Sequence, residues 1–313
     1  MKIIKSVCLV AVALLWSLGA NAQSRKYISQ FSQLQGYYNT GLMGYEGTMF
    51  RGFVRNQWAG MEGAPMTYYA ALELDVSELK GSSDAALTGR NALGLNMLHD
   101  RYGAFTETEI IVGYASRIRL NSSTNLRMGL GLNFNNIKLD GNHLTTEQAN
   151  DPLIGQYLNN FVEMRLLDFN LGIALTHEKY YLSYGVHNVN KGQISSGTVF
   201  MERKPRVAIF QAGYRSRLDE NVTVITNLMY RRQEDLPTNI EFNVKALLRN
   251  RVYLGAGHRI DYAHNFQLGF LMERVRVGYT YELPLAKTFL IPNPTHEFMI
   301  AYGLFREKGG LIW

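Results

Sequence analysis

Two carboxylates, Glu107 and Glu109, lie two residues apart and are the side chains in this sequence best spaced for acid–base chemistry. Residues at this spacing point to the same face of a β-strand. A carboxylate pair transfers protons when a cleft shifts the pKa of one member toward neutral pH. Nothing in the surrounding sequence indicates such a cleft. We therefore interpret both as strand residues that face a polar interior or solvent, without a catalytic role.

Other reactive side chains lack the spacing that catalysis or ligand binding requires. Gly129-Leu130-Gly131 and Gly255-Ala256-Gly257 lack the third glycine and the helix of a dinucleotide site, and we interpret them as bends or close backbone contacts in strands. No Gly-x-Ser-x-Gly turn occurs, and the only cysteine, Cys8, lies near the N-terminus. No histidine pair has metal-ligand spacing; the seven are His99, His143, His177, His187, His258, His264 and His296. The sequence predicts no catalytic residue, no metal site and no cofactor, and therefore no enzyme.

The composition narrows the remaining classes. The chain has 32 basic and 26 acidic residues, a net charge of +6, and no basic run interleaved with aromatics, so nucleic-acid binding is not indicated. A hydrophobic content of 46% excludes a disordered chain. The 19 tyrosines, 15 phenylalanines and 29 glycines, against only 7 prolines, favour strands with tight bends. Function is thus expected in binding, transport or assembly.

The first 22 residues have the features of a secretory signal peptide. Lys2 and Lys5 precede an apolar run over 7–18, and Ala20-Asn21-Ala22 provides small residues at the expected cleavage positions. Cleavage near Ala22 would leave a chain without cysteine. We expect the mature protein to be exported from the cytoplasm.

Alternation of apolar and polar residues dominates the chain after residue 45. In 274–283, Val275, Val277 and Tyr279 share one face, and Arg276 and Glu282 share the other. Such segments reach about ten residues, the length of an outer-membrane strand. Fourteen are predicted: 46–58, 64–75, 90–98, 105–120, 124–138, 165–176, 179–187, 206–217, 221–232, 237–248, 251–261, 264–271, 274–283 and 294–305.

Link lengths between these segments favour a barrel over a soluble sandwich. Outer-membrane barrels alternate short periplasmic turns with longer outer loops. Tight links follow even-numbered strands and long links follow odd-numbered ones, except that 76–89 is long and 262–263 is tight. The sequence predicts an all-β, antiparallel transmembrane barrel over 46–313, preceded by a periplasmic segment at 23–45. Tyrosines expected in the interfacial girdles are Tyr69, Tyr102, Tyr180, Tyr181, Tyr230, Tyr262 and Tyr302.

One segment, 57–67, departs from generic barrel sequence. It places a tryptophan before two glycines and an Ala-Pro pair, which is typical of an aromatic anchor entering a turn. Its distinctive residues are Gln57, Trp58, Gly60, Gly63, Ala64, Pro65 and Thr67. The segment resembles the signature of the PorP/SprF family of type IX secretion outer-membrane proteins from Bacteroidetes.

Other parts of the chain extend this resemblance over nearly the whole mature sequence. The segment from Asn39 to Gly44 is similar to the family's opening motif, with Thr40 in place of its proline, and 277–281 and 296–305 resemble its C-terminal strands. The chain continues past Phe305 to Trp313, and a terminal aromatic resembles the signal read by outer-membrane assembly machinery.

The resemblance implies a non-enzymatic outer-membrane component of the type IX secretion and gliding machinery. Its partners would be outer-membrane lipid, periplasmic ring components and outer-membrane components of the secretion machinery, and secreted surface proteins. We hypothesise that 57–67 and the loops 139–164 and 188–205 are partner surfaces. Loop 139–164 could instead plug the barrel, through an apolar stripe of Ile154, Tyr157, Leu158, Phe161 and Val162. The alternative function is an outer-membrane channel for small or hydrophobic solutes.

Overall fold

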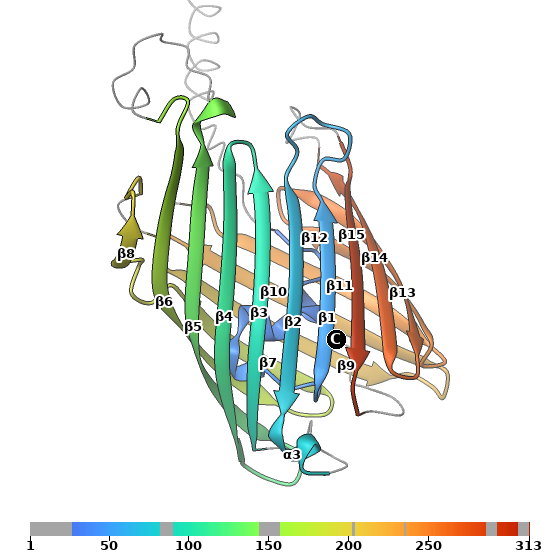
Figure 1. The fold of residues 1–313 in the computed structure, drawn as a ribbon. Coiled ribbons are helices and arrows are strands. Elements are labelled where there is room, and N and C mark those ends of the chain that lie inside the picture. Colours follow the sequence, from blue (N-terminus) through green and yellow to red (C-terminus); the bar gives the residue numbers. More distant parts are fainter. Residues whose placement is uncertain are drawn as a thin grey trace, which may run out of the picture.

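The computed structural model describes residues 27–81, 90–143, 157–201, 204–234, 236–285, 293–305 and 313. The predicted signal peptide and its cleavage site at Ala22 lie outside these ranges. In the described part, fourteen antiparallel strands form a closed barrel (Figure 1). Each pairs with its neighbour along the chain, and β15 pairs with β1 to close the ring.

The barrel strands match the fourteen predicted segments one for one, which confirms the predicted fold. Strand β8 is additional: it pairs with β6 beyond the end of β7 and lies outside the ring. The strands are β1 Met49–Asn56, β2 Met66–Asp75, β3 Asn91–Tyr102, β4 Phe105–Arg119, β5 Asn125–Asp140, β6 Phe161–Thr176, β7 Tyr180–His187, β8 Ile194–Gly197, β9 Val207–Arg217, β10 Val222–Gln233, β11 Asn239–Leu248, β12 Val252–Arg259, β13 Ala263–Met272, β14 Val275–Pro284 and β15 Thr295–Gly303. The helices are η1 Phe31–Gln33, α2 Gln35–Tyr38, η2 Thr40–Leu42, α3 Val76–Leu79 and η3 Gly141–His143.

The strands separate a polar inner face from an apolar outer face. On β14, Arg276, Thr280 and Glu282 are buried inside, while Leu283 is exposed outside. Large apolar side chains are exposed around the whole wall, for example Leu132 on β5 and Phe298 on β15. In water this surface would be an aggregation hazard, but a lipid bilayer covers it favourably. Two of the predicted girdle tyrosines, Tyr69 and Tyr181, instead face the lumen and are buried.

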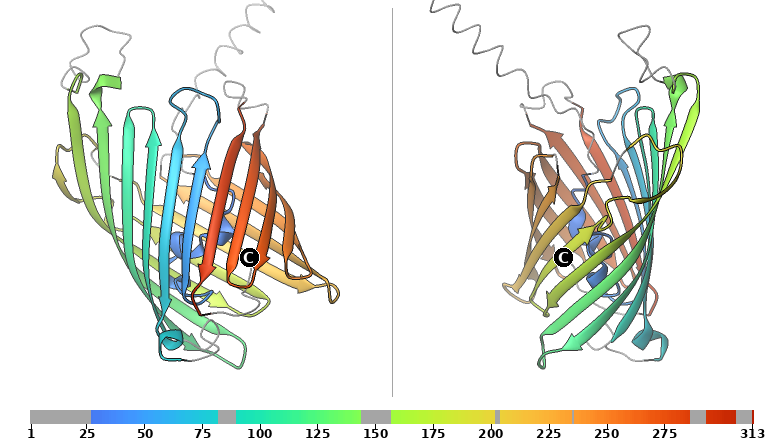
Figure 2. Two further views of the ribbon diagram at one scale, coloured as in Figure 1. Left: turned by 45° about the vertical axis from the view of Figure 1, so that its right-hand side comes forward. Right: turned by 90° about the vertical axis from the view of Figure 1, so that its left-hand side faces the viewer.

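The lumen is occupied by the chain's own N-terminal segment, Tyr27–Thr48, called the plug below. It forms η1, α2 and η2, which lie between the walls of the barrel (Figure 2). Every plug residue is buried. A periplasmic segment was expected over 23–45, whereas the described residues of this segment lie in the lumen. There, the barrel buries the plug's apolar side chains. Phe31, Leu34 and Met43 belong to its largest apolar cluster.

Glycines on the inner wall make room for the plug. A Cβ built on Gly129 would collide with the backbone of Thr40, and one on Gly172 would collide with the Asn39 side chain. Gly129 and Gly172 are paired across β5 and β6, so they form a flat path along which η2 lies against bare backbone. The interpretation of Gly129 as a site of close backbone approach is thereby confirmed.

The glycine path generates a first prediction. Gly172→Val should destabilise the barrel by about 1–3 kcal/mol, because the added side chain overpacks the contact with η2. Urea unfolding in lipid vesicles, followed by the mobility shift of heated and unheated samples in SDS gels, measures the change. Leu171→Val, one residue away on the exposed outer face, is the matched control. Equal stability of the two variants would contradict the close contact.

Candidate functional site

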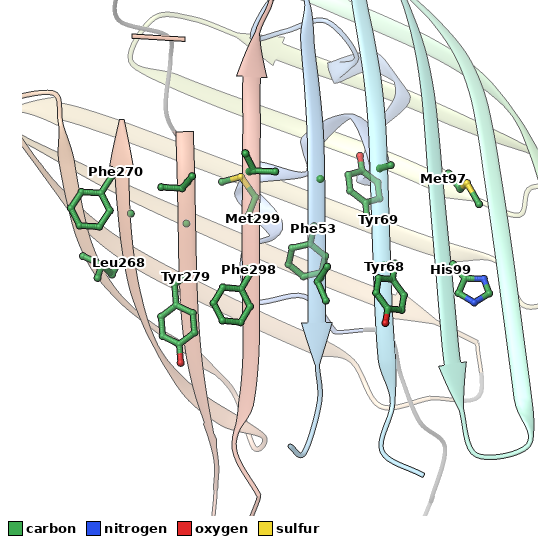
Figure 3. A pocket seen from close by; sticks show the side chains of 17 residues that line it. Phe53, Tyr68, Tyr69, Met97, His99, Leu268, Phe270, Tyr279, Phe298 and Met299 are labelled. Carbon is green, nitrogen blue, oxygen red and sulfur yellow. The ribbon is translucent and has the colours of Figure 1, made fainter. Parts of the chain in front are cut away.

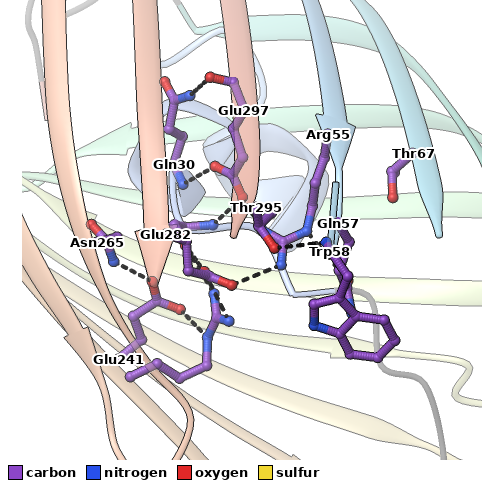
Figure 4. Close-up of polar contacts among 12 residues, drawn as sticks. Gln30, Arg55, Gln57, Trp58, Thr67, Glu241, Asn265, Glu282, Thr295 and Glu297 are labelled. Atoms are coloured by element: carbon purple, nitrogen blue, oxygen red, sulfur yellow. Dashed lines mark hydrogen bonds and ion pairs between the residues drawn. The ribbon is translucent and has the colours of Figure 1, made fainter. Parts of the chain in front are cut away.

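A cluster of five buried charges lies on the lumenal face of the barrel. We call it the lumenal cluster; it consists of Arg55, Glu241, Arg259, Glu282 and Glu297, from β1, β11, β12, β14 and β15. Arg259 Nε binds Glu241 at 2.8 Å, and its Nη1 lies 3.1 Å from Glu282. Arg55 lies 3.0 Å from Glu282 and also pairs with Glu297 (Figure 4).

The plug's backbone completes this cluster. Glu297 accepts hydrogen bonds from Ser29 N at 2.9 Å and Gln30 N at 3.1 Å. The Ser29 hydroxyl donates to Glu282 and accepts from Arg259 at 3.0 Å. These bonds satisfy carboxylate lone pairs that two guanidinium groups leave free. The plug is thus bound by charge-assisted hydrogen bonds, which are about twice as strong as neutral ones.

Burial explains why the cluster needs the plug. A charge removed from water loses several kcal/mol of hydration and is tolerated only with opposite charge and full hydrogen bonding. Arg55, Arg259 and Glu297 are nearly or fully inaccessible to solvent. The cluster has three carboxylates for two guanidiniums, and the Ser29 and Gln30 amides stabilise the excess negative charge. The N-terminal segment and the wall therefore depend on each other.

A second anchor lies nearer the end of the plug. Glu46 binds Arg51 of β1 at 2.6 Å and Arg276 of β14 at 3.3 Å. The same two arginines contact Gln33: Arg51 Nε donates to its carbonyl at 3.2 Å, and Arg276 donates to its side-chain oxygen at 2.7 Å. Two separated positions of the plug, Gln33 and Glu46, are thereby held by one pair of wall cations.

Carboxylates of β2 and β4 also bind the plug. Glu73 accepts from Gly44 N at 2.9 Å, and Glu109 accepts from the Tyr37 hydroxyl at 2.8 Å. Burial and the Glu109 carboxylate raise the pKa of Tyr37 well above its usual value, so this phenol remains a donor. Glu107, the neighbour of Glu109 in sequence, binds Lys204 at 2.7 Å. Both carboxylates therefore face the polar interior, as expected, and each binds a residue that is distant in the sequence.

The charge pairing yields a second prediction. Glu297→Gln should lower the free energy of unfolding by about 3 kcal/mol, because it removes a buried partner of Arg55 and weakens two plug amide bonds. Urea unfolding in vesicles measures it. Glu163→Gln on β6 removes an exposed pair with Arg165 and should leave the stability unchanged, since water screens that pair. An unchanged unfolding midpoint in Glu297→Gln would show that the buried pairing contributes nothing.

The motif at 57–67 forms the link between β1 and β2. Gln57 N donates to Pro65 O at 3.0 Å, which closes the turn, and Gly60 and Gly63 both have positive φ angles. Trp58 also has a positive φ, of 55°, which is strained for a non-glycine residue. It is held by its own amide, which donates to Thr295 Oγ1 at 3.2 Å.

The ends of the motif face the lumen, and its tip is exposed. Gln57 accepts from Arg55 at 3.4 Å, and Thr67 donates to Asp100 at 2.6 Å. Gly60, Met61, Glu62 and Gly63 are exposed, whereas Ala64 is half-buried and Pro65 is buried. The structure thus divides the motif into a structural base and an exposed tip.

The two residues of the opening motif lie in the plug, apart from this loop. Asn39 caps η2 by accepting from Gly41 N at 2.8 Å and donates to the Ile173 carbonyl of β6 at 3.0 Å. Gly44 has a φ of 66°, and a Cβ there would lie 2.5 Å from Ala92. Both positions favour the small or turn-forming residue that occupies them.

The long loops differ from the prediction in part. Residues 144–156, including Ile154, lie outside the described ranges. Phe161 and Val162 begin β6, so they belong to a strand and not to a helical stripe. The interior is filled by Tyr27–Thr48. In loop 188–205, Lys204 forms an ion pair with Glu107 of β4.

The outer wall carries an apolar groove of about 660 Å³ that spans β13, β14, β15, β1, β2 and β3 (Figure 3). Its exposed lining includes Tyr68, Phe270 and Phe298. Gly52 and Ala70 also line it, and their small size leaves the space unfilled. Because the groove lies on the apolar outer face, we assign it to the surface that lipid covers.

Two further features concern the described residues only. No group of three or more His, Cys, Asp or Glu side chains is arranged there to hold a metal ion. No helix in these ranges is long and apolar enough to cross a membrane.

A closed antiparallel barrel with an apolar exterior and a lumen filled by its own N-terminal segment is a plugged membrane barrel. The profile described as "Type IX secretion system membrane protein PorP/SprF" matches residues 20–302. The chain belongs to the PorP/SprF family, and it is therefore a membrane component of type IX secretion. The resemblance noted in the sequence is confirmed.

Several barrel proteins of solved structure are also similar to this chain, at low sequence identity. Omp33 of Acinetobacter baumannii is 8% identical with a TM-score of 0.45, covering 82% of this chain and 97% of that one. The Ralstonia pickettii toluene transporter TbuX is 10% identical with a TM-score of 0.45, covering 84% and 90%. The CymD monoaromatic hydrocarbon channel is 10% identical with a TM-score of 0.47, covering 84% and 88%. No curated protein sequence matches the chain significantly.

Proposed function

We propose that this chain is a non-enzymatic, non-conducting barrel of the outer membrane that serves type IX secretion through protein contacts. In this proposal it links periplasmic ring components or secreted surface proteins to the membrane. The observation that carries the proposal is the plug: Tyr27–Thr48 runs through the lumen and every residue of it is buried. Because the interior of the barrel is packed with its own chain, its function would depend on protein contacts at its surfaces and not on a pore.

The strength of plug binding favours this function over the alternative of a solute channel. A gate that must open frequently should be held by few and exposed contacts. Here, three separate groups of buried charges bind the plug, at Ser29, Glu46 and Gly44. Opening would leave those charges unpaired or would require water to enter the whole lumen.

Single-channel recording in planar bilayers is our third prediction. The mature chain, residues 23–313, should give no steady current, whereas a variant lacking 27–46 should conduct because the polar lumen fills with water. The heat-dependent mobility of each sample in SDS gels verifies that the barrel has folded. A large steady current through the unaltered protein would support the channel and overturn the proposal. If the deletion variant does not fold, the recording on the unaltered chain still decides between the two functions.

We further propose that the exposed tip of the 57–67 motif contacts a protein partner. Met61 and Glu62 are exposed, lie between two turn glycines, and their side chains are not needed for the backbone bonds that close the loop. The base of the motif, with Gln57 at one end of the turn and Pro65 at the other, keeps that tip in place. The loops 139–164 and 188–205 remain proposed as additional contact surfaces.

A fourth prediction tests the tip directly. Changing Met61→Ser together with Glu62→Ser should reduce the periplasmic or surface proteins captured with the barrel from crosslinked native envelopes by about tenfold, since it deletes contacts without altering the turn. Quantitative mass spectrometry of the captured proteins measures this. Ser122→Ala, in the exposed turn between β4 and β5, is the control. Unchanged capture by the double variant would exclude the tip, and secretion assays on the same strains report its importance in the cell.

A further inference from the structure

A recess of about 660 Å³ opens at the rim of the barrel where the turns between strands are short. It lies beside the turns 249–251 and 273–274, and it is also lined by Gly303 of β15, the strand that ends at the lower rim in Figure 1. Short turns face the periplasm in outer-membrane barrels. We therefore expect the recess to open toward the periplasm, next to the end of the plug, where Glu46 contacts Arg276.

Arginines dominate the charged lining of this recess. They come from β9, from β14 and from the two turns, and a single carboxylate, that of Glu273, lines the recess with them. The five are Arg215, Arg249, Arg251, Arg274 and Arg276. Guanidinium groups that share one recess repel each other unless anions lie between them. The recess therefore attracts negative charge.

The carboxylates around the recess neutralise this charge only in part. Glu46 pairs with Arg276 at 3.3 Å, but it also binds Arg51 at 2.6 Å. Glu46 and Glu178 attract Arg215 electrostatically, without a hydrogen bond to it in the described part of the chain. The buried Nη1 of Arg215 has no hydrogen-bond partner among the described residues. A buried donor of this kind calls for a further acceptor.

The two arginines of the turn 249–251 are the most accessible to a ligand. Arg249 and Arg251 are exposed, and neither side chain forms an ion pair within the described ranges. Glu273 is exposed as well and pairs with neither of them there. A guanidinium group binds a carboxylate through two parallel hydrogen bonds. One turn thus presents two arginines that can each receive a carboxylate.

An apolar surface adjoins the arginines. Leu247 and Leu271 line the recess and pack into one apolar cluster on the inner face of the barrel. The ring of strands separates this inner face from the surrounding lipid. A segment of a periplasmic protein can reach it, whereas the acyl chains of the membrane lie against the other face of the wall. A matching ligand needs carboxylates beside an apolar side chain, and a protein segment provides both.

We propose that this recess binds an acidic segment of a periplasmic protein, in which carboxylates flank an apolar side chain. Arg249 and Arg251 bind the carboxylates, Arg215 adds positive charge, and the two leucines receive the apolar side chain. The recess lies at the opposite rim from the 57–67 motif, which links the other ends of β1 and β2 (Figure 1). The inference rests on the proposed function, because it names the chemistry of one protein partner of the barrel.

Fluorescence anisotropy of a labelled peptide tests the proposal on residues 23–313 held in phosphatidylcholine nanodiscs. The probe is a rhodamine-labelled peptide amide with two glutamates on each side of one leucine. It should bind saturably, and the peptide with glutamine in place of every glutamate should bind about tenfold more weakly, because its bonds to arginine are no longer charge-assisted. This comparison needs no variant to fold. Equal binding of the two peptides, or no saturable binding, would overturn the proposal.

A pair of variants locates the binding. Arg249→Gln together with Arg251→Gln should weaken binding of the acidic peptide about tenfold, because two guanidinium groups are lost from the recess. Arg119→Gln together with Arg217→Gln is the matched control, since it removes the same charge from exposed positions of the same rim outside the recess. Its affinity should stay within about twofold of the unaltered chain, because salt screens distant charges. Equal losses in both double variants would refute the site.

Two further measurements address other occupants. Glycerol 3-phosphate, which has the phosphate of a lipid headgroup, should not displace the peptide at equal ionic strength; displacement would assign the recess to phosphate ligands instead. Glu307→Gln, in the segment 306–312 outside the described ranges, should leave the affinity unchanged; tighter binding would assign the arginines to a carboxylate of this chain. The recordings in planar bilayers do not depend on these results. A failure of this site and a failure of the proposed non-conducting function are therefore distinguished.

Discussion

The neutralisation of charge inside a closed barrel is the constraint on which the rest of this structure depends. An outer-membrane barrel must place its polar side chains inward, and a lumen full of water would hydrate them without further pairing. This lumen is instead packed, so Arg55, Arg259 and Glu297 lose their hydration and require partners. The partners come from both the wall and the plug. The position of the N-terminal segment and the identity of the inward-facing residues therefore depend on each other.

The same constraint links shape to sequence at other positions. Glycines at 129 and 172 thin the wall where η2 passes, and Tyr69 and Tyr181 fill the lumen instead of lying in the membrane girdle. Plug and barrel thus form a single core in which apolar packing and ion pairs alternate. For a member of a secretion family, such rigidity is compatible with a fixed platform at which other proteins assemble. It is less compatible with a gate that opens for each solute molecule.

The candidate site could be predicted only in part. The resemblance at 57–67 identified the family, and the turn glycines at 60 and 63 were recognisable from their spacing with Pro65. The lumenal cluster was not recognised, because residues such as Arg55 and Glu282 lie far apart in sequence and alternation alone assigns them to a wet interior. A signal was present in the plug: between Tyr27 and Thr48 the only acidic residue is Glu46, and aromatic residues are frequent, which is unusual for a segment exposed to water.

The sequence by itself determined the barrel: its strand number, the inward and outward faces of each strand and its family follow from a period of two, from link lengths and from local motifs, all of which are short-range properties. Only the tertiary structure decided what occupies the lumen. Pairings such as Ser29 with Glu297 or Ser32 with Trp313 join residues more than 260 positions apart. Local patterns contain no information about such contacts, because they arise when the ring closes and polar groups must find partners within the space that remains.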